Sequence, residues 1–280
     1  MTASVPSSME VVATACAIGA GVGYGWAWWR GREKTSRFIS PRRVWFFLSG
    51  LAISWIAMAS RLAVLDHQLL TFHMVNHLLL SNVSAPLILL GEPLLVFRQG
   101  LQDWGYFGSF FRSPRLEDLV RAIAHPVFCW TASITTLAVW HIPGVFAAAM
   151  HSTFLHGFEA VSFLVAGLLF WSPIVEPWPV RHMRPRWWAP IYLLLATFPC
   201  DALSGFLAFC DRVVYSSYLV MPRHFALSAL QDQECAAALM WTFVTILYLV
   251  PGVALTVNEV TRTGEQTASA QLVTIKKKGA

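Results

Sequence analysis

Six of the nine histidines in this chain fall at one end of its hydrophobic segments. They are His67, His73, His77, His141, His151 and His156. Imidazole is a good ligand for copper, zinc and iron. Side chains from separate helices can bind one metal ion if the helices bring them to the same depth. The grouping therefore predicts a metal site whose ligands come from several segments.

His73 and His77 are four residues apart, so on a helix they lie about one turn apart on the same face. Paired histidines of zinc proteases share this spacing, but those enzymes need a glutamate directly after the first histidine. Met74 occupies that place. The sequence also contains no nucleophile–base arrangement that we recognise. We therefore expect a non-enzymatic metal ligand pair, or else the ordinary polar start of a helix.

His141 and His156 are the other two expected metal ligands, and two acidic residues could support them. Glu159 follows His156 by three residues, so it could orient that histidine, bind the metal itself or form a purely structural pair. Asp232 is expected either to cap the last helix or to act as a ligand. His151, a further histidine at this end, is a lesser candidate.

Soft and buried groups near the histidines bear on the choice of metal. Thioethers favour Cu(I), and Met74 and Met240 both fall in the same half of the hydrophobic segments, although each could simply fill the core. Asp201 lies inside an apolar segment, where a carboxylate needs a partner. These residues favour copper over zinc or iron.

Composition predicts an all-α membrane protein. The chain of 280 residues is 56% hydrophobic and only 12% charged, and about 20 apolar residues cross a bilayer as a helix. This length predicts seven transmembrane helices, with Pro86 expected to kink the third. They are residues 10–29, 43–63, 69–91, 123–141, 153–173, 188–210 and 233–256.

The distribution of basic residues predicts the orientation. With the N-terminus outside and the C-terminus inside, 17 of the 20 Lys and Arg residues fall on the inner side. The histidine-rich end then faces outward. Residues 1–260 are expected to form one integral membrane domain, followed by a disordered, basic cytoplasmic tail at 261–280. The positive charge follows membrane sidedness, so no nucleic-acid partner is expected.

The chain resembles the CtaG-type cytochrome c oxidase assembly factors, a family of multi-span bacterial membrane proteins. The resemblance runs from about residue 45 to 257, through short motifs in a fixed order. These are His73–His77, Ala85-Pro86 with Gly91, His125-Pro126, Trp140–Pro143, His156 with Glu159, Phe170-Trp171, Asp232-Gln233 and Met240-Trp241. Asn76 stands where many relatives are expected to have Gln.

The resemblance implies a role in building haem–copper oxidases in the bacterial plasma membrane. It implies copper handling at the outer face, with His73, His77, His141 and His156 as ligands and Glu159 and Asp232 in support. The expected partners are cytochrome c oxidase subunits, periplasmic copper chaperones and the lipid bilayer. Two alternatives stay open. One is a haem-binding membrane cytochrome, with axial histidines from different helices such as His73 and His156. The other is a copper permease using Asp201, Cys200 and Met240.

Overall fold

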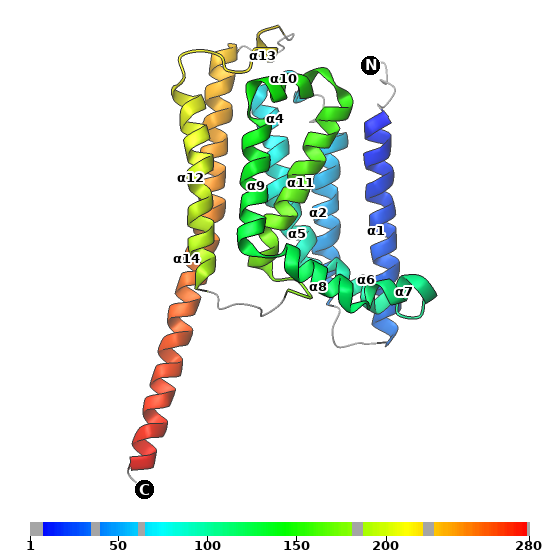
Figure 1. Cartoon of the computed structure of the whole chain (residues 1–280), viewed down its shortest axis with the longest axis vertical. Helices are drawn as coiled ribbons and strands as arrows, with labels where there is room; N and C mark the ends of the chain where they lie inside the picture. Colours follow the sequence, from blue (N-terminus) through cyan, green and yellow to red (C-terminus); the bar gives the residue numbers. More distant parts are fainter. Residues whose placement is uncertain (1–7, 35–39, 61–64, 181–186, 221–226, 279–280) are drawn as a thin grey trace.

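The computed structural model describes residues 8–34, 40–60, 65–180, 187–220 and 227–278, and every element within them is a helix (Figure 1). The elements are α1 (Ser8–Lys34), α2 (Pro41–Ala59), α4 (Leu70–Leu78), η1 (Leu79–Ser84), α5 (Ala85–Leu90), α6 (Pro93–Gly100), α7 (Gly105–Phe111), α8 (Pro114–Ile123), α9 (Pro126–Trp140), α10 (Pro143–His151), α11 (Thr153–Val175), α12 (Trp188–Phe209), α13 (Ser217–Val220) and α14 (Ala229–Lys278). The all-α fold class predicted from the composition is confirmed.

Several of these helices are long and apolar enough to cross a membrane, so the chain is a membrane protein. Within the described residues, five stretches meet this criterion: Glu10–Arg32, Leu70–Gly100, Thr153–Val175, Trp188–Phe209 and Ala229–Thr261. The pair α8 and α9, bent by 61°, makes a sixth if it counts as one span. A helix also lies at the remaining predicted span. This is α2, whose first turn contains Arg42 and Arg43, and these charges lower its mean hydropathy.

The long helices pack side by side. α12 lies along α14, α9 along α11, and α2 contacts α1, η1 and α5 (Figure 1). The outward sides remain apolar, as lipid requires. On α11, for example, Phe154, Phe158 and Val165 are exposed, whereas Gly157 and Phe163 face the interior. Because both sides are apolar, hydrophobicity alone does not define which side faces the bundle.

The third predicted span is a helix interrupted by a π-helical turn. α4 continues into η1, where the amide of Ala85 donates to the carbonyl of Leu80, five residues earlier. α5 then begins with Pro86 in its first turn. The π-helical turn therefore ends just before Pro86, the residue at which a kink was predicted because proline lacks an N–H. Ser84 Oγ anchors this turn to α2 through the Gly50 carbonyl at 2.8 Å.

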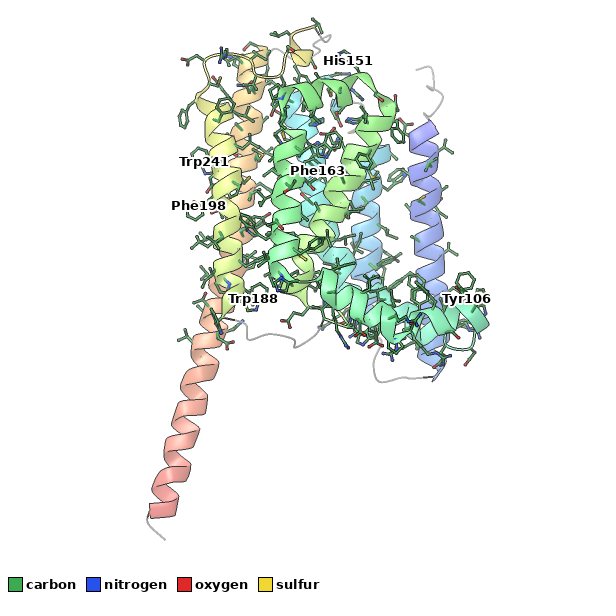
Figure 2. All side chains as sticks on the ribbon, in the orientation of Figure 1. Tyr106, His151, Phe163, Trp188, Phe198 and Trp241 are labelled. Atoms are coloured by element: carbon green, nitrogen blue, oxygen red, sulfur yellow. The ribbon has the colours of Figure 1, made fainter. Side chains whose placement is uncertain are left out.

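Short helices lie at the end of the bundle opposite α10 and α13. α6, α7 and α8 run roughly across the long helices, and Figure 2 shows Tyr106 of α7 and Trp188 of α12 at this end, away from His151. Tyr106, Phe107 and Phe110 are exposed on α7, which suits a helix lying at a membrane surface.

The tail predicted to be disordered is helical in the structure, because α14 continues to Lys278 and extends away from the other helices (Figure 1). An isolated helix is marginal in water, so helical backbone here does not exclude disorder in solution. Both the disordered tail at 261–280 and the single domain at 1–260 stay predictions.

Gly167 permits the closest approach between α11 and η1. A Cβ atom at this position would overlap the backbone carbonyl oxygen and Cα of Ser81. This contact holds α11 against the helix that carries His73 and His77. A side chain here would push the two helices apart.

We expect Gly167→Ala to destabilise the protein by about 1–3 kcal/mol, because an overpacked backbone contact must shift. The measurement is the midpoint of thermal unfolding in detergent. Gly144→Ala is the matched control, since a Cβ at Gly144 meets nothing within 4 Å. Equal midpoints for the two variants would contradict this account of the packing.

Candidate metal centre

His73 and His77 point from successive turns of α4 toward Glu159 of α11. The Nε2 atoms of the two histidines are 2.8 Å apart. Glu159 Oε1 lies 3.1 Å from Nε2 of His77 and 3.4 Å from Nε2 of His73. All three side chains are buried, with exposed fractions of 1% for His73, 5% for His77 and 1% for Glu159. We call these three residues the inner group.

The spacing of the inner group suits one metal ion. A point in the plane of the three atoms lies about 1.8 Å from each, so an ion slightly out of that plane reaches the ~2.0–2.2 Å bonds of imidazole and carboxylate ligands. Without a metal, the same atoms can share protons in hydrogen bonds. The spacing therefore permits a metal without requiring backbone movement.

Asp66 orients His73 from the loop that precedes α4. Its Oδ1 atom lies 3.1 Å from Nδ1 of His73. An ionised carboxylate only accepts hydrogen bonds, so Nδ1 of His73 carries the proton. In neutral His73, the unprotonated Nε2 then faces His77 and Glu159. A carboxylate that fixes the tautomer of a metal-binding histidine in this way is a common feature of metal sites.

The loop around Asp66 is held in place by hydrogen bonds from two other elements. Tyr218 of α13 donates to the Asp66 carbonyl oxygen at 2.8 Å, and Asn76 of α4 donates to Oδ2 at 3.2 Å. Burial alone would raise the pKa of the Asp66 carboxyl. The charge of His73 and the hydrogen bonds from His156 and His73 outweigh burial and lower this pKa well below its usual range, so the carboxyl is ionised.

His156 lies between the two carboxylates. Its Nε2 atom is 3.1 Å from Asp66 Oδ2, and its Nδ1 atom is 3.5 Å from Glu159 Oε2. The second distance is that of an ion pair and not of a well-aligned hydrogen bond. The predicted ligand His156 is thus brought close to His73, with ring centroids 5.7 Å apart, but it belongs to a different group of potential ligands.

That second group consists of Asp66, His67 and His156. Each can offer one ligand atom, and these atoms lie within 4.8 Å of one another. The rings of His67 and His156 are 4.8 Å apart between centroids, and both side chains are partly exposed. We call these three residues the outer group. It borders a cavity of about 260 Å³ between α1, α2, α4 and α11.

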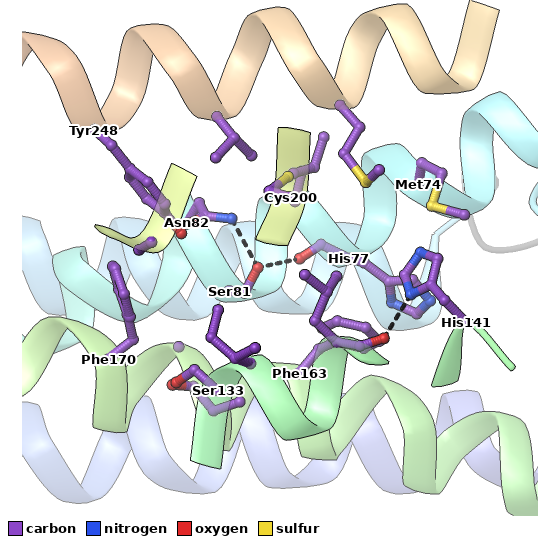
Figure 3. A pocket seen from close by; sticks show the side chains of 18 residues that line it. Met74, His77, Ser81, Asn82, Ser133, His141, Phe163, Phe170, Cys200 and Tyr248 are labelled. Atoms are coloured by element: carbon purple, nitrogen blue, oxygen red, sulfur yellow. Dashed lines mark hydrogen bonds between the residues drawn. The ribbon is translucent and has the colours of Figure 1, made fainter. Parts of the chain in front are cut away.

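His141 lies apart from both groups of potential ligands in the described part of the chain. It follows α9, and its Nδ1–H donates to the carbonyl of Leu137 at 2.8 Å. Its other nitrogen, Nε2, is buried without a hydrogen-bond partner. His141 and His77 both line a second cavity, of about 70 Å³, deeper between the helices (Figure 3).

The predicted sulfur residues line this second cavity and not the inner group. Figure 3 shows Met74, His77 and His141 at one end and Phe170 and Tyr248 at the other. Met240 and Cys200 complete its wall from α14 and α12. The nearest potential ligands around His73 and His77 are therefore nitrogen and oxygen atoms.

Two other supporting candidates lie elsewhere. His151 is exposed at the end of α10, where Figure 2 shows it at the outer edge of the bundle. Asp201 is partly exposed on α12, near the hydroxyls of Thr197 and Thr245. Neither His151 nor Asp201 belongs to the inner or outer group. Two of the remaining histidines of the chain, His182 and His224, lie outside the described residues.

Asp232 does not cap its own helix, as was expected, but the start of a neighbouring one. It lies in the first turn of α14, but its carboxylate accepts from the backbone amides of Leu70 at 2.7 Å and Thr71 at 3.1 Å. The Thr71 hydroxyl also donates to Asp232 Oδ1 at 2.7 Å. Asp232 therefore caps α4, whose own N-cap residue, Leu69, has no side-chain hydrogen bond. Ser228 and Gln231 cap α14 instead, as a capping box.

Asp66 is the site residue that the sequence did not reveal. It lies in a short loop between two apolar segments, and no helical spacing links it to His73 or His156. The one signal is an acidic residue directly before a histidine, at the end of the bundle where the other histidines gather. That signal is too weak to single out Asp66 among the other acidic residues near helix ends.

The comparisons with known proteins agree with the resemblance described above. The sequence model of one family, the cytochrome c oxidase caa3 assembly factor (Caa3_CtaG), matches residues 22–261. Among curated proteins and solved structures, none matches the chain. The matched region contains both groups of potential ligands, the cavity of about 70 Å³ and Asp232, whereas Glu10 and Ala13 of the larger cavity precede it.

Asp232→Ala should destabilise the protein by about 1–2 kcal/mol, because the first amides of α4 lose a buried acceptor. The measurement is the midpoint of thermal unfolding in detergent. Glu234→Ala is the control, since Glu234 is an exposed acidic residue of the same turn. If both variants unfold at the wild-type temperature, the cap contributes nothing.

Proposed function

Because the chain belongs to the cytochrome c oxidase caa3 assembly factor family, we propose that it binds copper at the inner group and delivers it to an oxidase subunit. The protein then works as a non-enzymatic copper carrier of the bacterial plasma membrane. Periplasmic copper chaperones are the proposed source of the metal. Nothing in the proposal involves a nucleic acid.

The observation that carries this proposal is the convergence of three ligand atoms from two helices. The atoms of His73, His77 and Glu159 lie within 3.4 Å of one another in an otherwise apolar interior. A buried carboxylate is costly unless a cation or hydrogen bonds offset its charge. A copper ion supplies that charge, binds the unprotonated Nε2 of His73 and displaces the proton that Nε2 of His77 shares with its neighbours.

The ligand types favour copper among the divalent metals. For sites of nitrogen and oxygen atoms, affinity among the first-row divalent ions is greatest for Cu²⁺. Two imidazoles and a carboxylate suit Cu(II) better than Cu(I), because the nearby sulfurs of Met74 and Met240 line the neighbouring cavity. This is a change from the expectation of a soft, sulfur-containing site.

The proposed orientation places both groups near the outer face. We propose that α2 is the seventh span and that the N-terminus lies outside. The start of α1, α10 and α13 lie at one end of the bundle, while α6, α7 and α8 lie at the other (Figure 1). Arg98, Arg112, Arg115 and Arg121 belong to the second end, as expected for the cytoplasmic side.

A haem at the predicted pair of axial ligands fits this geometry poorly. Two axial nitrogens must approach the iron from opposite faces of a flat macrocycle. His73 and His156, the pair first considered, are instead bridged by Asp66 on one side and Glu159 on the other. The expected absorption spectrum of the purified protein therefore has no Soret band.

A copper permease is the second candidate, because the cavity of about 70 Å³ begins at His77 and extends toward Asn82 and Tyr248. This path crosses the π-helical turn, and such turns are frequent at functional sites. Asp201 is absent from the residues that line it, contrary to the expected route. Copper uptake by proteoliposomes separates transport from delivery. A permease fills the lumen with copper, whereas a protein that only binds and delivers copper leaves the lumen free of it.

We expect His73→Ala combined with His77→Ala to lose the tightly bound copper, with affinity at least 100-fold weaker, since two of three ligands are gone. Copper is measured by mass spectrometry after loading and dialysis against a mild chelator. His125→Ala is the control, because His125 is exposed and belongs to the opposite end of α9. Retention of wild-type copper content in the double variant would eliminate the inner group as the site.

A second test addresses the orientation. In a cysteine-free background, His151→Cys should react with a membrane-impermeant thiol reagent on intact cells, whereas Ser109→Cys in α7 should react only after lysis. Both residues are exposed, and their helices, α10 and α7, lie at opposite ends of the bundle (Figure 1). The reverse pattern would invert the proposed topology.

A further inference from the structure

The two carboxylates of the centre each contact ligands of both groups. Asp66 uses Oδ1 to orient His73 of the inner group, while its Oδ2 lies 3.1 Å from Nε2 of His156 in the outer group. Glu159 offers Oε1 to the inner group, while its Oε2 faces Nδ1 of His156 at 3.5 Å. Each carboxylate thus serves one group as a potential ligand and the other as the partner that orients a histidine.

From this reciprocal arrangement we infer that Asp66, His67 and His156 form a second metal site, which takes up copper before it passes to the inner group. The inference rests on the proposed function for the identity of the metal. Its ligand atoms are different from those of the inner group.

The geometry of the outer group fits a metal ion bound between His156 and Asp66. Their facing atoms are 3.1 Å apart, which is within the range of distances between the ligand atoms of the inner group. A metal ion replaces the proton that these two atoms share. Glu159 Oε2 then lies at an ion-pair distance of 3.5 Å from the opposite nitrogen of His156, whereas Asp66 is hydrogen-bonded to that of His73 at 3.1 Å.

Exposure indicates which group receives the metal first. The inner ligands are almost fully buried, whereas His67 and His156 are partly exposed beside the cavity of about 260 Å³. That cavity has room for a hydrated ion and also touches His77 of the inner group. A metal ion can therefore reach the outer group from the cavity and move inward by exchanging ligands one at a time.

Direct contacts between the groups make such a transfer short. The ring centroids of His73 and His156 are 5.7 Å apart. The two proposed metal positions are therefore separated by little more than the width of one imidazole ring. Asp66 and Glu159 contact both histidines throughout, which keeps negative charge beside the ion along the whole path. The oxidation state of the copper does not change in this step.

The test counts bound metal in single-site variants of the full chain in detergent. Wild-type protein titrated with Cu²⁺, and separately with Zn²⁺, should bind two ions of unequal affinity. His67→Ala should bind only the tighter ion. His151→Ala is the matched control, as an exposed histidine at the same end of the bundle that should retain both ions.

The combined variant His73→Ala, His77→Ala separates this inference from the proposed function. If the second site exists, that variant retains one weakly bound ion, and adding His67→Ala removes it. A wild-type protein that binds one ion, unaffected by His67→Ala, overturns the second site but leaves the proposed function intact. Unchanged binding in the inner-group variant overturns the proposed function instead.

Magnetic resonance gives a readout that folding defects do not imitate. Two Cu²⁺ ions about one side chain apart should broaden each other's electron paramagnetic resonance signal when the second equivalent is added. This broadening should be absent in His67→Ala, which stays folded because His67 is only partly buried. A wild-type spectrum that shows isolated Cu²⁺ at two equivalents would overturn the inference.

Discussion

Two carboxyl groups buried in an apolar helix bundle are the constraint on which this centre depends. An isolated charge in such an interior costs several kcal/mol even after the protein relaxes. Asp66 and Glu159 are both almost fully buried, and histidines surround each of them. The orientations of His73, His77 and His156 therefore follow from their contacts with the two carboxylates. Packing limits the choice further, because Phe163 stacks on His77 and Phe146 lies against His73.

The helices around the centre are held where backbone atoms approach closely or where polar groups meet. Gly167 brings α11 against η1, Ser84 ties that turn to α2, and Asp232 fixes the first turn of α4. Lipid offers no hydrophobic force that would press these helices together, so close van der Waals contact and buried hydrogen bonds have to do it. His73 and His77 thus depend on contacts one to three turns away from them.

Sequence reasoning succeeded where the signal was local. Long apolar stretches predicted helices at all seven positions, and the four-residue spacing placed His73 and His77 on one face, as found. The three-residue spacing likewise related Glu159 to His156. These inferences need only the period of the helix.

It failed where the answer depended on which helices are neighbours. Asp232 was expected to cap its own helix or to act as a ligand, and its carboxylate caps a different helix. Asp66 went unnoticed because a loop residue has no periodicity. His141 shares a cavity with His77 but is not part of either group of potential ligands in the described residues, so its role as a ligand stays a prediction. One sequence contains no information on lateral packing in a bundle that is apolar on every side.

The bond from Asp232 to Leu70 has a consequence for the order in which this protein is made. The two residues are 162 positions apart in the chain. The paired histidines are therefore synthesised long before the residue that anchors their helix. A nascent chain that lacks α14 has the imidazoles without the rigid start of α4. The positions of His73 and His77 are therefore fixed only once α14 has packed against α4.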